Sequence, residues 1–109
     1  MERKAVEEVA ETLKILAHPV RLQIIALLSS KEESVGHIAI SVKQRQSFIS
    51  HQLSIMKRSK LLKRMCYGNK IYYSIHDYQM KQFLNCLMSQ YVNRVNDTSH
   101  KTTTDTYIP

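Results

Sequence analysis

The sequence predicts a mostly α-helical domain of the α+β class, with five helices and one β-hairpin. Three observations lead to this prediction. Apolar residues recur at spacings of three and four along most of the chain, which is the repeat of an amphipathic helix. The two prolines are Pro19 and Pro109, so the long interior contains no proline that would break a helix. After Leu61 the apolar repeat shortens toward two, which is the repeat of a β-strand.

The chain has the length of one domain. A sequence of 109 residues is too short to bury two independent hydrophobic cores. We expect residues 1–95 to form the domain and residues 96–109 to be a flexible tail, since this end is rich in Thr and lacks apolar periodicity. We expect neither a signal peptide nor a membrane partner, because the first residues are charged and no apolar run approaches roughly 18 residues. Because the chain has two cysteines and no export signal, the expected location is the cytoplasm.

The first two helices are predicted on either side of His18. The first covers residues 3–17, with an amphipathic pattern, and the second begins at Pro19, where a missing amide hydrogen removes no helical hydrogen bond. Leu22 and Ile25 belong to the broad apolar face of the second helix. The apolar positions of the first helix are Val6, Val9, Ala10, Leu13, Leu16 and Ala17.

A short helix and a longer one follow. The short helix is predicted over residues 35–41, with Ser34 as its N-terminal cap. After a polar break, the longer helix covers residues 46–59 and has apolar residues at helical spacing. Its opposite face is small, polar and uncharged. The apolar side contains Ile49, Leu53 and Met56, and the polar side contains Ser47, Ser50, His51 and Ser54.

The segment LLKRMCYGNKIYYSI is predicted to form the hairpin. Two strands are joined by a turn at residues 67–70, in which Gly68-Asn69 tolerates the positive φ angles of a tight turn. Lys63 and Arg64 lie on the first strand and Lys70 lies at the turn, so this hairpin is basic.

The last helix is predicted over residues 78–95 and carries a wide apolar stripe. The stripe could pack entirely on its own domain, but so small a domain has too little core to cover it. We therefore expect a homodimer formed by the first and last helices. The residues predicted at this dimer interface are Val6, Val9, Leu13, Leu84, Leu87, Met88 and Tyr91.

Charge is distributed unevenly along the chain. The formal net charge is +7, and no acidic residue occurs between Glu33 and Asp77. A surface of one charge sign is what binding to phosphates requires, so the sequence favours a polyanionic partner. The basic residues of this interval are Lys43, Arg45, Lys57, Arg58, Lys60, Lys63, Arg64 and Lys70.

A short capped helix, a break and a second helix with a small polar face together indicate a helix-turn-helix. Its second helix can enter the major groove of double-stranded DNA, and the basic hairpin beside it can act as a wing. The alternatives are an ordinary solvated helix face, a hairpin that is basic only for solubility, and a protein-interaction module. The residues predicted to bind DNA are Arg45, Gln46, Ser47, Ser50, His51, Gln52, Lys57, Lys63, Arg64 and Lys70.

Four segments in this order resemble the ArsR-type winged helix-turn-helix repressors: LKILAHPVRLQIIALL, ESVGHIA, QSFISHQLSIMKRSKLL and GNKIYYSI. The resemblance covers about residues 8–95. It implies five helices with a wing, a homodimer built from the first and last helices, and repression that an inducer relieves. Two positions depart from the family pattern. Arg45 stands where the family usually has a Ser cap, and Ser59-Lys60 replaces a common acidic-Gly pair.

Many members of this family sense metal ions, but the corresponding positions here are poor ligands. In one family pattern the ligands are two cysteines at the start of the third helix, and these positions are Ser34-Val35-Gly36 here. In the other pattern the ligands are Asp and His on the last helix, and these positions are Asp77, Gln79, Gln90 and Asn93. Only Asp77 is a good ligand, whereas zinc needs about four donors from Cys, His or carboxylate. We expect no metal and no cofactor. We also do not expect an enzyme, because the basic interval has no carboxylate, the sequence has no Gly-rich phosphate loop, and no Cys–His or Ser–His pair has a recognisable third member.

Cys66 in the hairpin and Cys86 on the last helix are the remaining candidates for sensing a signal. Some relatives switch through a disulfide between the second and last helices, but the second helix here has no cysteine. Two interpretations stay open: a redox-responsive repressor that uses these thiols, and two buried, inert cysteines.

Overall fold

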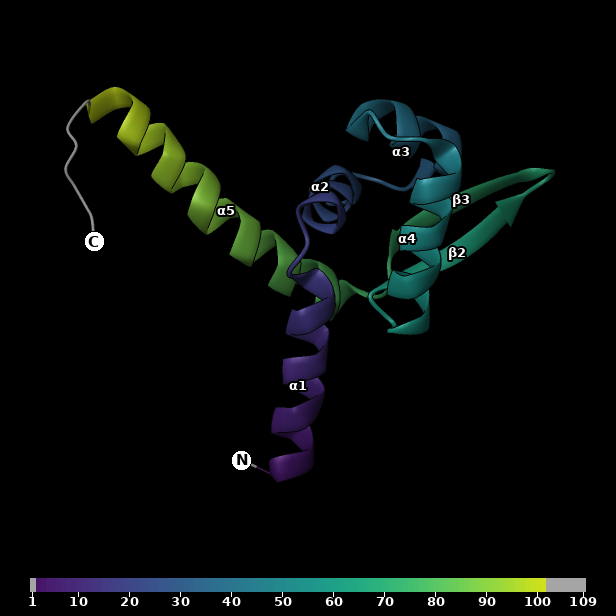
Figure 1. Ribbon diagram of the computed structural model, residues 1–109. Coiled ribbons are helices and arrows are strands. Elements are labelled where there is room, and N and C mark those ends of the chain that lie inside the picture. The colour runs from purple at the N-terminus through teal and green to yellow at the C-terminus, as the bar shows by residue number, and fades with distance from the viewer. Residues whose placement is uncertain (1, 102–109) are drawn as a thin grey trace.

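The computed structural model describes residues 2–101 of the protein, and describes side chains up to residue 90. Within this part of the chain, five helices and a small antiparallel sheet form the α+β architecture that the sequence predicts (Figure 1). In chain order the elements are α1 (Arg3–Leu16), α2 (Pro19–Leu28), β1 (Glu33–Ser34), α3 (Val35–Val42), α4 (Gln46–Arg58), β2 (Leu62–Tyr67), β3 (Lys70–Ile75) and α5 (Tyr78–Lys101).

Element boundaries differ from the prediction mainly at α5. This helix continues to Lys101, six residues beyond the predicted end at Val95, so residues 96–101 are helical. A polar segment without Pro or Gly can continue a helix after its apolar repeat has ended. The predicted tail at residues 102–109 lies outside the described residues.

The sheet has three strands in the order β1-β3-β2. The hairpin register runs from Leu62 opposite Ile75 to Tyr67 opposite Lys70, which leaves a two-residue turn. Of the two turn residues predicted to tolerate a positive φ, Gly68 adopts one, at 65°, and Asn69 does not. Strand β1, whose two residues pair with β3, was not predicted, because a strand of two residues shows no alternating repeat.

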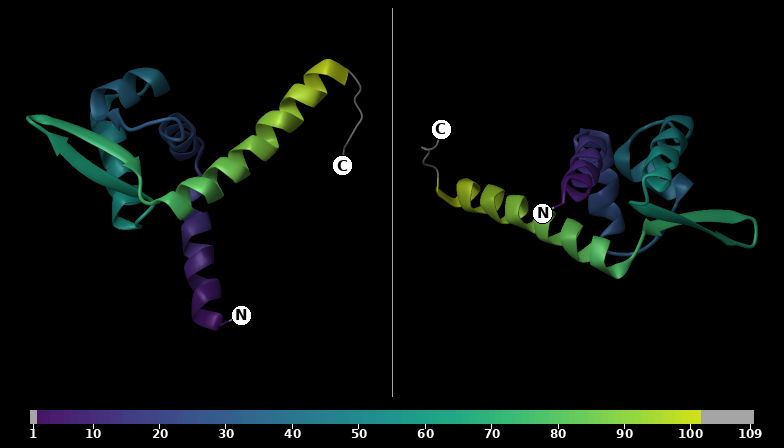
Figure 2. Two further views of the ribbon diagram at one scale, coloured as in Figure 1. Left: turned by 180° about the vertical axis from the view of Figure 1, so that it is seen from behind. Right: turned by 90° about the horizontal axis from the view of Figure 1, so that it is seen from below.

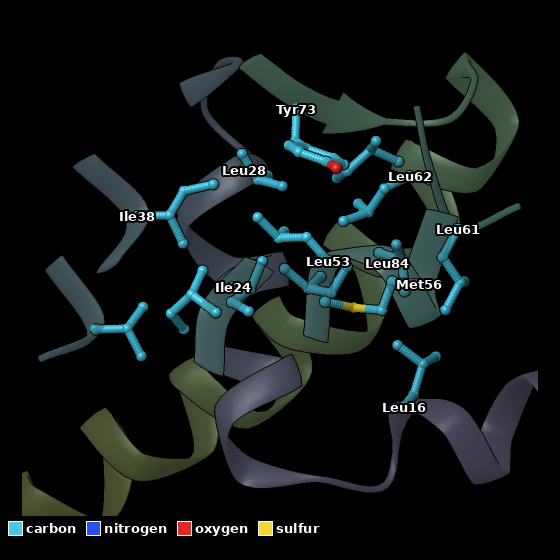
Figure 3. Packing of buried hydrophobic residues seen from close by; sticks show 14 of the residues in the cluster. Leu16, Ile24, Leu28, Ile38, Leu53, Met56, Leu61, Leu62, Tyr73 and Leu84 are labelled. Atoms are coloured by element: carbon cyan, nitrogen blue, oxygen red, sulfur yellow. The ribbon is translucent and has the colours of Figure 1, made fainter. Parts of the chain in front are cut away.

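The hydrophobic core lies between α2, α3, α4 and the base of the hairpin (Figure 3). The side chains converge from all of these elements, and the first part of α5 adds one more. Because α4 contributes a complete row of buried residues, the core fixes the position of this helix against α2 and α3. Labelled in Figure 3 are Leu16, Ile24, Leu28, Ile38, Leu53, Met56, Leu61, Leu62, Tyr73 and Leu84.

Helices α1 and α5 extend away from this body in different directions (Figures 1 and 2). In α1 only Leu16, at its C-terminal end, is buried. Val6, Val9 and Leu13 are 49%, 54% and 48% exposed in a single chain, although all three are apolar. No helix within residues 2–101 is both long enough and apolar enough to cross a membrane.

Candidate nucleic-acid interface

Helices α3 and α4 are joined by a sharp turn of three residues, 43–45. At its start, α3 is capped as predicted, since the Ser34 hydroxyl accepts a hydrogen bond of 3.2 Å from the His37 amide. At its end, Lys43 adopts a left-handed conformation with a φ of 60°. The Lys43 amide donates to Ile40 O and the Gln44 amide donates to Ala39 O, which is the Schellman arrangement. This closure reverses the chain direction and brings α4 against α3.

The N-terminus of α4 has no side-chain cap. Arg45 occupies the N-cap position with an extended backbone, and its side chain makes no capping hydrogen bond. This follows from chemistry, because a guanidinium has donors only and cannot accept from an amide. The first turn of α4 therefore relies on the packing of Ile49 for its position rather than on a cap.

One side of α4 is entirely buried. Ile49, Leu53 and Met56 have no exposed surface, and they recur at spacings of four and three. Ser47, His51, Ser54 and Arg58 are exposed and also recur at spacings of four, three and four. They form a stripe along the opposite side of the helix, which we call the α4 outer stripe.

The structure corrects the prediction for Gln52. Gln52 was predicted to bind DNA, but its side chain is 7% exposed and lies in the row of buried residues. Its Oε1 accepts a hydrogen bond of 2.8 Å from Arg21 Nε on α2. Spacings of three from Ile49 and four to Met56 put Gln52 on the core side of α4. A polar residue type was thus mistaken for an exposed position.

The predicted DNA-binding residues did not include Ser54, which was predicted on the polar side of this helix, or Arg58, which was counted among the basic residues of the acid-free interval. Both are exposed on the same side of the helix as Ser47 and His51. The signal was present in the spacing of seven residues from Ser47 to Ser54 and from His51 to Arg58. An Arg at this position adds a group that can bind guanine through two hydrogen bonds.

The other predicted residues are exposed on α4 and the hairpin. None of them forms an ion pair with another side chain among the residues whose side chains are described. Their charges are therefore available to a partner. The exposed residues of this group are Arg45, Gln46, Ser50, Lys57, Lys63, Arg64 and Lys70.

The wing presents its cations on two faces. Lys63 pairs with Ser74 and Arg64 pairs with the buried Tyr73, so the two basic side chains point to opposite faces of the hairpin. Near the tip, the Tyr67 hydroxyl donates to Glu32 Oε1 at 3.4 Å. The negative charge of Glu32 is the main cause that raises the pKa of Tyr67. This contact ties the hairpin to the connection between α2 and β1.

The predicted dimer residues divide into three groups. Val6, Val9 and Leu13 are exposed on α1, while Leu87 and Met88 are partly exposed on α5. The prediction for Leu84 is wrong, because this side chain is 0% exposed in the core of its own chain. It is the position where α5 packs on the body, which the periodicity of α5 cannot separate from its other apolar positions. Tyr91 lies outside the residues whose side chains are described.

A cavity of about 510 Å³ separates α1 from the start of α5. Apolar side chains contribute most of its wall, and polar groups lie at the edge. Such an open apolar cavity leaves both helices without a covering layer in a single chain. The lining residues are Ala5, Glu8, Val9, Thr12, Leu13, Asp77, Gln79, Met80 and Phe83.

Two of the residues at the positions that bind metal in the family act as helix caps here. Ser34 caps α3, and Asp77 caps α5 by accepting a 2.8 Å hydrogen bond from the Met80 amide. This hydrogen bond, aided by His76 Nδ1 at 3.2 Å, lowers the pKa of Asp77. Gln79 is exposed and supplies only a weak amide ligand. Among the residues with described side chains, no three of the types His, Cys, Asp and Glu gather into a group. These positions do not fit zinc, and the lack of a metal signal stays a prediction.

Both thiols are free and exposed in the single chain. Cys66 lies on β2 opposite Ile71, and Cys86 lies on α5. Neither thiol is therefore buried within its own chain, and whether they are reactive stays a prediction.

Helices α3 and α4, with the β2–β3 hairpin beside them, define a winged helix-turn-helix domain, the architecture of DNA-binding transcription regulators. The sequence profile described as "Bacterial regulatory protein, arsR family" matches residues 18–64. The chain is 39% identical over 88 residues to the transcriptional repressor PagR of Bacillus anthracis, covering 80% of this chain and 88% of that protein. The chain belongs to the ArsR family of bacterial regulatory proteins.

Solved structures agree with this membership. The crystal structure of PagR superposes with a TM-score of 0.69, covering 79% of this chain and 99% of that chain at 39% identity. The homodimeric winged helix-turn-helix DNA-binding domain Mb0332 of Mycobacterium bovis superposes with a TM-score of 0.72 at 27% identity, covering 98% and 96% of the two chains. A transcriptional repressor SmtB homolog of Synechocystis is 35% identical over 71 residues, which is 65% of this chain and 54% of that protein. The match thus spans about half the length of that relative.

Proposed function

We propose that this protein is a homodimeric repressor that binds a specific inverted-repeat sequence in double-stranded DNA. The observation that carries the proposal is the α4 outer stripe, which is exposed, polar and next to a hairpin with unpaired cations. The relatives support the regulatory role, since PagR is named a transcriptional repressor. Its task is binding rather than catalysis.

The chemistry of the stripe suits the major groove. The hydroxyls of Ser47 and Ser54 can donate to or accept from base edges, and the His51 ring can do the same. Arg58 offers the donor pair that matches guanine O6 and N7. The cations of the wing supply contacts to phosphates, which position the protein without reading sequence. The surface therefore combines groups for specificity with groups for affinity.

The dimer completes this proposal. Val6, Val9 and Leu13 on α1 are apolar and about half-exposed, and the cavity beside them opens toward the start of α5. A second copy of the chain that covers α1 and α5 would bury this surface. Two-fold symmetry would then place two α4 helices on half-sites one helical turn apart, roughly 34 Å.

Fragment selection from the source genome provides the operator, and variants then test the surface. Ser47→Ala and His51→Ala should each weaken operator binding by about 1–3 kcal/mol for each lost base contact. Lys70→Ala should weaken binding to all duplexes alike and reduce the salt slope by about 1. Ser30→Ala, an exposed serine between α2 and β1, is the matched control. A wild-type protein that binds no duplex at low salt would instead indicate a protein-interaction module.

A second candidate is a repressor whose DNA binding responds to its thiols, and the exposure of Cys66 and Cys86 favours it. Hydrogen peroxide would oxidise two thiols to one disulfide and be reduced to two water molecules. The bond would form either between these two residues or between subunits. Peroxide should then release the operator from the wild-type protein but not from the Cys66→Ser/Cys86→Ser variant, whereas zinc and a chelator should leave binding unchanged. A peroxide response that survives in the double variant excludes this candidate.

A further inference from the structure

Arg21 lies at the junction of three helices. It belongs to α2, and its Nε donates a 2.8 Å hydrogen bond to Gln52 Oε1 on α4. Its Nη1 donates a 3.0 Å hydrogen bond to the backbone oxygen of Ile15 in the last turn of α1. One guanidinium therefore connects the helix proposed to bind DNA with a helix proposed to form the dimer.

The contact at α1 completes the hydrogen bonding of that helix end. The last carbonyls of a helix have no partner inside the helix. Here the Ala17 amide binds the oxygens of Leu13 and Lys14, and the His18 amide binds the oxygen of Leu16. The oxygen of Ile15 is left for Arg21, whose positive charge is also favourable at the C-terminal end of a helix.

The hydrogen bond at α4 is made to a buried polar side chain. Gln52 is the single buried polar side chain among the described residues. A buried amide oxygen without a donor would cost free energy, so the Arg21 bond holds the two groups together. No acidic side chain with described contacts forms an ion pair with Arg21. The Arg21 guanidinium therefore binds two neutral oxygens, Gln52 Oε1 and the backbone oxygen of Ile15.

The orientation of α1 depends on few contacts, which makes this one important. Only Leu16 of α1 is buried, and the helix otherwise extends away from the body (Figures 1 and 2). A helix of 14 residues is about 21 Å long, so a tilt of about 10° at its base moves its far end by roughly 4 Å. In a dimer such a tilt would change the spacing of the two α4 helices.

We propose that Arg21 and Gln52 are positioning residues: their hydrogen bond, with the bond from Arg21 to Ile15, sets the angle between α1 and α4. In this way they select the spacing of the two DNA half-sites without touching DNA. This inference rests on the proposed function for its effect on DNA, but the angle itself can be measured without DNA.

The first experiment measures the angle. Spin labels are placed at Lys4→Cys on α1 and Ser54→Cys on α4 in a chain whose native cysteines are Ser, and labelled chains are diluted with excess unlabelled chains. Gln52→Leu removes the acceptor and fills the space with an apolar side chain, while Gln52→Glu keeps the acceptor. Gln23→Leu makes the same change at an exposed position of α2 and is the matched control.

We expect a narrow distribution of label distances in the parent chain, in Gln52→Glu and in Gln23→Leu, and a broader one in Gln52→Leu. Arg21→Met should broaden the distance distribution as Gln52→Leu does. If Arg21→Met does not fold, the result for Gln52→Leu alone tests the proposal. Equal widths in folded Gln52→Leu and the parent overturn the proposal. This result needs no DNA, so it stands even if the parent binds no duplex and the proposed function fails.

The second experiment uses operators whose half-sites are moved apart or together by one base pair. Folded Gln52→Leu should bind the natural operator roughly 10- to 100-fold more weakly, the range for losing one charge-assisted hydrogen bond. It should also discriminate less between the spacings, while its binding to non-specific DNA stays unchanged. If Gln52→Leu leaves both the operator affinity and the preference for half-site spacing unaltered, the proposal is overturned. It is also overturned if the variant loses only the preference for the base at a single operator position, since this would show that Gln52 reads a base directly.

Discussion

Replacing Lys60 by Gly should stabilise the protein. Lys60 follows the end of α4 with a φ of 63°, a region that glycine adopts without steric cost. The Leu61 amide donates to Met56 O at 3.0 Å and the Lys60 amide donates to Lys57 O at 3.0 Å, which closes α4 in a Schellman motif. The backbone must keep this conformation to start β2, so the Lys side chain has to tolerate it.

The expected gain follows from two opposing effects. The left-handed conformation costs a residue with a Cβ roughly 1–2 kcal/mol. Glycine loses about 0.5–1 kcal/mol more backbone entropy on folding. The free energy of unfolding should therefore rise by about 0.5–1 kcal/mol, which raises Tm by roughly 2–8 °C in a domain of this size. Both proteins are compared at one protein concentration, because dimerisation also affects Tm.

Two further variants separate backbone strain from charge. Lys60→Ala removes the same charge but keeps the Cβ, so it should give no comparable gain. Lys57→Gly places glycine in the last turn of α4, where the backbone is still helical, and should lower stability by up to about 1 kcal/mol. If Lys60→Gly is no more stable than Lys60→Ala, the argument from the left-handed conformation is refuted.

Three other predictions follow from the packing and the helix caps. Leu84→Ala should lower the free energy of unfolding by about 2–5 kcal/mol in urea denaturation, because the side chain is completely buried; a loss below about 1 kcal/mol would contradict its place in the core. Leu87→Glu should instead raise the monomer fraction in sedimentation, and an unchanged dimer would remove Leu87 from the interface. The pKa of Asp77 is lowered in the folded state mainly by the hydrogen bond from the Met80 amide. The charged carboxylate therefore stabilises the fold above the unfolded pKa of about 3.9, and this contribution is lost as the pH falls through the folded pKa. The difference in Tm between wild type and Asp77→Ala should accordingly shrink below about pH 4, and a constant difference would exclude the charged cap.

Local sequence features determined most of the elements. Helical spacing of apolar residues placed α1 to α5, and the pair Gly68-Asn69 placed the hairpin turn. Ser34 was identifiable as a cap from its position before a short apolar run. These features are recognisable because each depends on residues within one or two turns of the chain.

Which side of a helix meets which neighbour was decided only by the tertiary structure. Gln52 has a polar side chain on the core side of α4, and its burial depends on a donor 31 residues away, Arg21. Leu84 belongs to the same apolar stripe as Leu87, but only Leu84 reaches the core of its own chain. The repeat of a helix specifies a face, whereas the partner of that face is specified by contacts between distant segments. The sequence by itself thus determined the winged helix-turn-helix and its basic surface, and the tertiary structure decided which polar residues face outward and which hold α4 in place.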